Sequence, residues 1–224
     1  MIPRELIATA PVPGGAEPLR LIRRGGEFSI MLGANELMNS RLSGSEEAMS
    51  RLAQAMIAGV AKPRILIGGL GMGFTLRTAL EVFGAGAAIE VAELVPEIVD
   101  WARGPMAALH EGTLEDSRVT IHLGDVGAII RASAARYDAI LLDVDNGPDG
   151  LSREGNDALY TAAGLNQAWN ALRPGGVVSV WSSGPDPRFT ARLRKTGFVV
   201  SEEIVRARRT GGGARHTIWL AQRR

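Results

Sequence analysis

The chain has 224 residues, of which 46% are hydrophobic and 22% charged, with a formal net charge of +1 and no cysteine. This composition is typical of a water-soluble protein with one large core. It excludes disulfides, thiolate zinc sites and cysteine nucleophiles, and it gives no reason to expect a polyanionic partner. No segment approaches the roughly 20 apolar residues of a membrane span. The absence of cysteine fits a reducing cytoplasm, so we expect a cytoplasmic protein with no membrane partner. The three histidines are scattered, so we expect no metal site.

Residues 1–44 predict a leader followed by a small β appendage. Residues 1–18 are rich in Pro, Gly and Ala and are expected to form a loosely held leader. The segments LRLIRR and EFSIMLG then flank Gly25 and Gly26, a pair that suits the tight turn of a β-hairpin. We therefore expect a hairpin within residues 19–38.

The remaining residues, 45–224, alternate short apolar runs with helical patterns and are expected to form the main domain. Apolar strands that are each followed by a crossover helix favour a parallel sheet with helices on both faces. After a helix at about 188–195, FVVSEEIVRA and ARHTIWLAQ add two strands that pair antiparallel at one edge. The fold class is therefore α/β, with a seven-stranded, mostly parallel, Rossmann-like sheet. The other strands are predicted at 64–69, 88–93, 119–123, 137–143 and 177–181, and the other helices at about 45–59, 74–83, 96–109, 126–133 and 156–172.

Glycines follow the first strand of this sheet, at the edge where such sheets bind ligands. GGLGMG lacks the Gly-Lys-Ser/Thr ending of a P-loop and does not fit the dinucleotide pattern G-x-G-x-x-G. What remains is Gly69, Gly71 and Gly73, which could bring backbone close to a ligand. A tight turn between strand and helix explains the same glycines.

Two acids follow the next two strands. Glu93 is placed to accept the hydroxyls of a ribose, and Asp125 could accept a hydrogen bond from an adenine amino group. Helix capping is the alternative for each residue. Taken with the glycines, the two acids predict an adenosine ligand that is bound without phosphate recognition.

The order of these segments resembles a known family. RILIGGLGMGFTLR, VAELVPEIVDWA, DSRVTIHLGDV, RYDAILLDVDNGPD and ALRPGGVVSVW resemble the core of the spermidine synthase (polyamine aminopropyltransferase) family, a branch of the class I S-adenosylmethionine-dependent methyltransferase fold. The resemblance covers about residues 60–182, and the β appendage resembles that family's N-terminal sheet. It implies a homodimer active in polyamine biosynthesis, with S-adenosylmethionine or decarboxylated S-adenosylmethionine as donor. The glycine loop would hold the methionine-derived part, Glu93 the ribose and Asp125 the adenine, while the loop from Asp143 would lie under the sulfonium and the acceptor.

Three features depart from the family pattern. Met72 replaces the aspartate that holds the amino end of decarboxylated S-adenosylmethionine, and a thioether cannot balance an ammonium. Asn146 stands where the family has its usual base, with Asp145 one residue earlier, and GSEEAMS replaces a Tyr-His-Glu stretch. On these grounds we place methyl transfer slightly ahead of aminopropyl transfer.

The acidic segment LLDVDNGPDG supplies the candidate catalytic residues. An amine must be neutral when it attacks a sulfonium, and a nearby carboxylate can take its proton. Asp143 and Asp145 are the candidates, because residues two apart at the end of an extended strand share a face. We expect Asp145, Asn146 and Trp181 to contact the acceptor, a small molecule and plausibly an amine. Filling the edge of the core is an equal alternative for Trp181.

Two other functions stay open. Residues 188–224 contain ten Arg or Lys and two acids, which would suit an RNA methyltransferase that grips phosphates. A solvated edge hairpin protected by its charges explains the same residues and is favoured, so we do not expect a nucleic-acid partner. The second alternative is a non-catalytic paralogue that binds S-adenosylmethionine without turnover.

Overall fold

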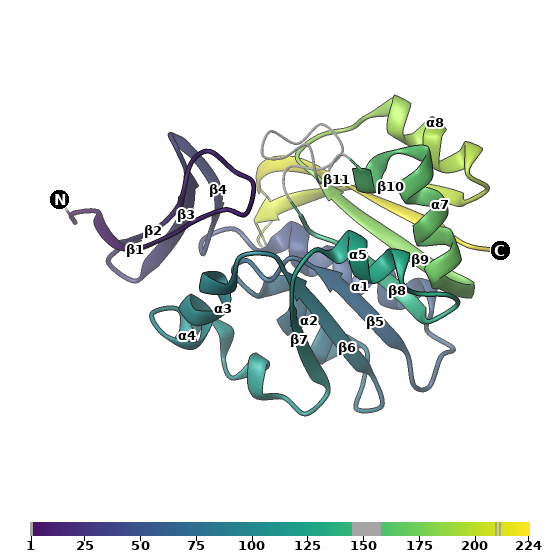
Figure 1. Cartoon of the computed structure of the whole chain (residues 1–224), viewed down its shortest axis with the longest axis horizontal. Helices are drawn as coiled ribbons and strands as arrows, with labels where there is room; N and C mark the ends of the chain where they lie inside the picture. Colours follow the sequence, from purple (N-terminus) through teal and green to yellow (C-terminus); the bar gives the residue numbers. More distant parts are fainter. Residues whose placement is uncertain (1, 145–157, 209, 211) are drawn as a thin grey trace.

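The computed structural model describes residues 2–144, 158–208, 210 and 212–224, and contains two sheets (Figure 1). The larger sheet has seven strands in the order β10-β11-β9-β8-β5-β6-β7. β11 runs antiparallel to both β9 and β10, and the other described pairs of neighbouring strands in this sheet are parallel, so the α/β prediction and the antiparallel edge are confirmed. The strands are β5 (Arg64–Gly68), β6 (Ala88–Glu93), β7 (Val119–Leu123), β8 (Tyr137–Leu142), β9 (Leu172–Ser182), β10 (Val199–Arg208) and β11 (Gly212–Gln222).

Helices cover both faces of this sheet because its central strands are apolar on both sides. In β5, Ile65 and Ile67 join the core on one face, and Leu66 joins the core on the other. The first core includes α1 (Gly44–Met56), α2 (Phe74–Val82) and α3 (Pro96–Arg103). The second includes α5 (Val126–Arg131), α7 (Ala162–Ala171) and α8 (Pro187–Lys195), which lie on the front face in Figure 1.

The small N-terminal sheet is larger than the expected hairpin. Its four antiparallel strands follow chain order, and Gly25 and Gly26 form the turn between β2 and β3 as predicted. The expectation of a loose leader over residues 1–18 is wrong, because β1 lies within it and pairs with β2. Pro3 and Pro11 stand just outside this strand, where a missing N–H breaks no ladder hydrogen bond. The strands are β1 (Glu5–Ala10), β2 (Leu19–Arg24), β3 (Glu27–Leu32) and β4 (Asn35–Asn39).

Some helix and strand ends differ from the predicted ones. The helix expected over 96–109 ends at Arg103 and resumes as the short α4 (Ala107–His110). Gly104 and Pro105 separate the two pieces, and proline has no N–H for the helical ladder. After η1 (Thr113–Glu115) the elements follow the expected order. Part of the helix expected over 156–172 lies outside the described residues. No helix in the described ranges is long and apolar enough to cross a membrane.

Candidate active site

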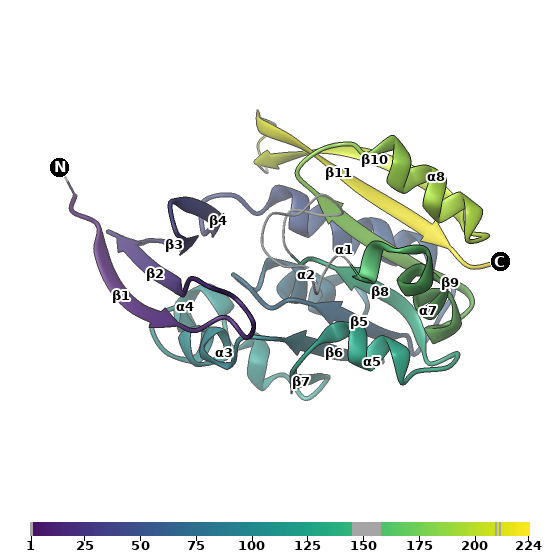
Figure 2. The ribbon, with the colours of Figure 1, turned by 45° about the horizontal axis from the view of Figure 1, so that its top comes forward.

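A cavity of about 540 Å³ lies at the carboxyl ends of β5, β6, β7 and β8. Glu93, the last residue of β6, lines it together with Gly69, Asp125 and Asp143, which come after the ends of β5, β7 and β8. The loop between β1 and β2 and the segment around β4 form the other wall, so the N-terminal sheet roofs the cavity. Figure 2 shows this loop in dark purple, reaching across to the main sheet. The volume falls within the range that small-molecule sites occupy.

The glycine loop has a conformation that only glycine adopts without strain. Gly69, Gly71 and Gly73 all have positive φ, at 89°, 49° and 79°. A Cβ at Gly69 would lie 2.5 Å from the carbonyl oxygen of Asp143, and one at Gly73 would lie 2.4 Å from Nδ1 of His110. The tight turn is therefore real, and Gly69 and Gly71 also face the cavity.

Glu93 holds the glycine loop from beneath. Its Oε2 accepts the N–H of Leu70 at 2.9 Å, and its Oε1 accepts the N–H of Val95 at 2.9 Å. Burial raises the pKa of Glu93, although these backbone N–H groups oppose the rise. Glu93 is therefore fixed in place before any ligand arrives.

Asp125 caps α5, as the alternative interpretation predicted. Its carboxylate accepts the N–H of Gly127 at 2.9 Å and the N–H of Ala128 at 3.1 Å, and Arg131 lies 3.5 Å away. The same residue lines the cavity. Capping and ligand contact are thus compatible, because a carboxylate has more lone pairs than the two backbone bonds use.

Asp143 stands at the junction of the large cavity and a smaller one. Its Oδ2 accepts a hydrogen bond of 2.6 Å from the Thr75 hydroxyl, and its N–H donates to the carbonyl of Gly68 at 3.1 Å. Burial raises the pKa of Asp143. Asp145 and Asn146 lie outside the described residues.

The smaller cavity, of about 50 Å³, contains a carboxylate that sequence reasoning missed. Asp143, Trp181 and Met72 line it together with Glu46 from the first turn of α1. Burial, and next the charge of Asp143, raise the pKa of Glu46 to about 7. The structure therefore brings Trp181 to the same hollow as Asp143 and adds a second acid there.

A protein-family model described as the spermine/spermidine synthase domain matches residues 49–188 of the 224. The chain belongs to this family. The fit of Gly69, Glu93, Asp125 and Asp143 to the resemblance seen in the sequence agrees with that membership, since all four lie inside the matched region.

Curated relatives of the chain are named for two different reactions. Polyamine aminopropyltransferase 2 of Pseudomonas aeruginosa is 34% identical over 156 residues, covering 66% of this chain and 42% of that protein. Putrescine N-methyltransferase 4 of Nicotiana tabacum is 35% identical over 124 residues, covering 53% of this chain and 30% of that protein. The chain thus spans less than half the length of the curated relatives it matches.

Solved structures of the family share the fold. A crystal structure of spermidine synthase in complex with the transition-state analogue AdoDATO matches with a TM-score of 0.73 and 17% identity. The match covers 98% of this chain and 72% of that one, so it includes the N-terminal sheet as well as the main sheet. Both sheets therefore belong to the architecture of the spermidine synthase family.

The charged side chains that line the two cavities are all acidic. The large cavity is lined by Glu17, Glu93, Asp125 and Asp143, and the small one by Glu46 and Asp143. Within the described part of the chain, neither lining contains Lys or Arg. The buried Met72 lines the cavity that Glu46 also lines. The smaller cavity thus has a carboxylate from α1, although residue 72 contributes none.

Proposed function

We propose that the chain is an aminopropyltransferase that moves the aminopropyl group of decarboxylated S-adenosylmethionine to an amino group of a small polyamine. The anionic lining of the two cavities is the observation that carries this proposal. Decarboxylated S-adenosylmethionine has a sulfonium and an ammonium but no carboxylate, and polyamines are cations, so carboxylates complement both. This reverses the order that the sequence suggested, because Glu46 adds a second carboxylate beside Asp143 in the smaller cavity, where a cationic acceptor can bind.

The described residues fit such a donor. When bound, it supplies a carbon activated by the positive sulfur. Gly69 and Gly71 present backbone to the large cavity, and Glu93 and Asp125 would accept hydrogen bonds from the ribose and the adenine. Asp143, at the junction of the cavities, would face the sulfonium, and Trp181 would line the path of the acceptor.

Several parts of the proposal rest on the sequence and the family alone. Asp145 and Asn146 are proposed to contact the acceptor, with Asp145 as a candidate catalytic residue. Residues 1–44 are proposed to act as a unit that roofs residues 45–224, in a homodimer located in the cytoplasm. Transfer to RNA is not proposed, because acids line the site and the N-terminal sheet covers it.

Methyl transfer to a diamine is the second candidate. It is supported by the N-methyltransferase relative from Nicotiana tabacum and by Met72. The two reactions use different donors, S-adenosylmethionine for the methyl group and its decarboxylated form for the aminopropyl group. They are therefore separable in one assay.

The test offers both donors to the protein together with a panel of diamines and polyamines. Mass spectrometry of the products distinguishes an added methyl from an added aminopropyl group. Calorimetric titration should show that the decarboxylated donor binds at least about tenfold more tightly, because the acidic lining repels the carboxylate that only S-adenosylmethionine carries. Tighter binding of S-adenosylmethionine, or methylated products alone, would contradict the proposal.

Two substitutions of Asp125 should separate its role as a helix cap from its proposed contact with the adenine. Asp125→Ala should lower the free energy of unfolding by about 1 kcal/mol through loss of the helix cap. Asp125→Asn keeps a good capping residue and should melt close to the wild type, yet bind the donor about tenfold more weakly because one acceptor oxygen is lost. Thermal melting and calorimetry of both variants check this. Unchanged donor affinity in Asp125→Asn would remove the adenine role.

A further inference from the structure

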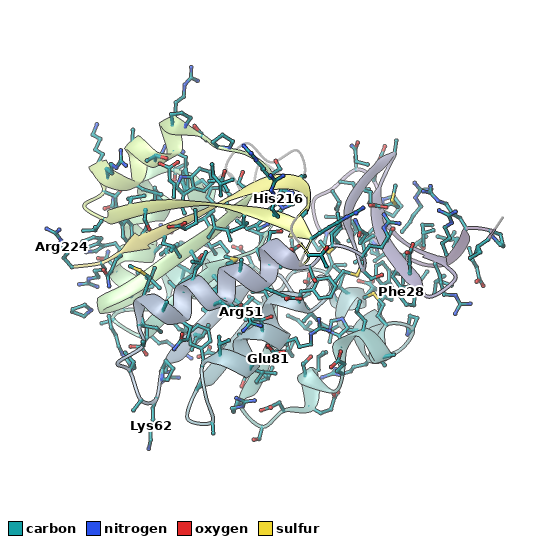
Figure 3. All side chains as sticks on the ribbon, turned by 180° about the vertical axis from the view of Figure 1, so that it is seen from behind. Phe28, Arg51, Lys62, Glu81, His216 and Arg224 are labelled. Carbon is teal, nitrogen blue, oxygen red and sulfur yellow. The ribbon has the colours of Figure 1, made fainter. Side chains whose placement is uncertain are left out.

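Three side chains form a hydrogen-bonded row beside the smaller cavity. The hydroxyl of Ser45 donates to Oε2 of Glu46 at 2.7 Å, and Nδ1 of His216 lies 2.8 Å from the same hydroxyl oxygen. His216 comes from β11 and reaches the first turn of α1, as Figure 3 shows from behind. Trp181 packs edge-on against His216, with ring centroids 4.7 Å apart. His216, from the last strand of the chain, therefore contacts Glu46 indirectly, through the hydroxyl of Ser45.

The donor and the acceptor of each hydrogen bond in this row can be assigned. A hydroxyl carries one proton, so when Ser45 donates to Glu46, His216 must be the donor from its Nδ1. Burial lowers the pKa of His216, which keeps the ring neutral and leaves one N–H for this bond. Both hydrogen bonds thus point toward Glu46 and stabilise its carboxylate form.

The charged groups around Glu46 set how readily it takes a proton. Asp143 faces it across the small cavity, and two carboxylates in one hollow disfavour double ionisation. The neighbouring Glu47 lies 3.7 Å from Arg77 on α2, so that cation is engaged elsewhere. Burial and the charge of Asp143 raise the pKa of Glu46 to about 7, the range in which a general base works best near neutral pH.

We propose that Glu46 is the catalytic base that takes the proton of the acceptor amine, and that Ser45 and His216 are positioning residues for it. This rests on the proposed function. The acceptor amine loses a proton to Glu46, its nitrogen forms a bond to the aminopropyl carbon, and the bond from that carbon to sulfur breaks. The electron pair of the broken bond stays on sulfur, which leaves as a neutral thioether.

Position distinguishes Glu46 from Asp143 in this step. Asp143 lines both cavities and is hydrogen-bonded to Thr75 beside the glycine loop, which places it on the donor side. Glu46 lines the smaller cavity together with Trp181 and does not line the larger one. An amine that enters the smaller cavity therefore meets Glu46 as well as Asp143.

Kinetics of Glu46→Gln over a pH series test the proposal. The rate of the wild type should rise with pH through about 7, as the base loses its proton. Glu46→Gln should lose this rise and lower kcat by at least about 10²-fold. Donor affinity should change by less than about threefold, because Glu46 does not hold the donor. Glu81→Gln is the matched control: Glu81 is an exposed partner of Arg51 on the α1–α2 surface, and its loss should change neither quantity.

The positioning residues have a separate signature. Ser45→Ala removes the donor to ionised Glu46, so the rise of rate with pH should move to higher pH. His216→Asn should move it in the same direction by a smaller amount. A residue that only supported the fold would lower the yield of active protein and leave the position of this rise unchanged.

Thermal melting gives a readout that needs no donor. Because the pKa of Glu46 rises from 4.5 to about 7 on folding, the folded chain binds more protons than the unfolded chain in this window. The free energy of unfolding should therefore fall as the pH rises from about 5 to 8, and should fall less in Glu46→Gln. Parallel melting curves for the two proteins would contradict the electrostatic basis of the proposal.

The possible outcomes distinguish a failure of the proposed transferase function from a failure of the role proposed for Glu46. A wild type that transfers nothing from either donor contradicts the proposed function and this role with it. An active wild type with an equally active Glu46→Gln contradicts the role of Glu46 alone. A Glu46→Gln protein that keeps the pH-dependent rise but loses donor affinity about tenfold also overturns it, because Glu46 would then bind the donor.

Discussion

Gly69→Ala should unfold at a clearly lower temperature than the wild type and lose measurable donor binding. The φ of Gly69 is 89°, and its new Cβ would lie 2.5 Å from the carbonyl oxygen of Asp143. That oxygen belongs to backbone, which cannot rotate away as a side chain would. Strain at φ and the collision together should cost about 2–5 kcal/mol. Relief requires moving the Leu70 N–H away from Glu93, which distorts the cavity wall.

Gly84→Ala is the matched control for this variant. Gly84 also has a positive φ, of 76°, but nothing lies within 4 Å of its added Cβ. It therefore measures the backbone strain without the collision. The difference in melting temperature between the two variants isolates the close approach to Asp143, and calorimetry should find donor affinity unchanged in Gly84→Ala. Equal melting temperatures would show that the loop at Gly69 adapts freely.

Asp143→Asn should fold normally and lower kcat by about 10³-fold, the upper range for the loss of one electrostatic group in a transition state. Asparagine has the same shape and can still accept the hydrogen bond from Thr75, so the structure should persist. What disappears is the negative charge at the junction of the two cavities. Because burial raises the pKa of Asp143, its ionisation destabilises the fold, and the variant should be at least as stable as the wild type at pH 8.

Asp116→Asn is a useful contrast to Asp143→Asn. The Arg118 side chain lowers the pKa of Asp116 to about 2, so this charge stabilises the fold above pH 4 and the stabilisation is lost as the pH falls toward 2. Its removal should leave kcat unchanged and reduce stability slightly at neutral pH. A kcat for Asp143→Asn within tenfold of the wild type, with normal folding, would remove Asp143 from the proposed site.

The main sheet and its ligand edge could be predicted because the apolar pattern of each strand in the sequence matches its buried place in the sheet. The run YDAILL is continuously apolar since β8 is buried on both faces, and the residues that follow each parallel strand necessarily meet at one edge. Glu93 and Asp125 could be placed by that rule alone. Their partners in the structure, backbone N–H groups, also follow from the glycine loop and the helix start.

Other features depend on contacts between distant segments and left no local signal. Glu46 reads in the sequence as an ordinary acid in the first turn of a helix, where negative charge is generally favourable. Only the docking of α1 against β8 and β11 brings it to Asp143 and His216. Strand β1 was missed for a related reason: ELIATA is short, and its partner β2 lies beyond a loop.

The insertion of β11 between β9 and β10 affects the order in which the two halves of the site can mature during synthesis. The large cavity lies at the ends of β5 to β8, and these strands are all synthesised before β9. The hydrogen-bonded row at Glu46 needs His216, which is in place only when β11 has entered the sheet beside β9. A nascent chain that has emerged through β8 therefore contains Glu93, Asp125 and Asp143 but has no support for Glu46. The C-terminal hairpin is therefore the last element that the surroundings of Glu46 require.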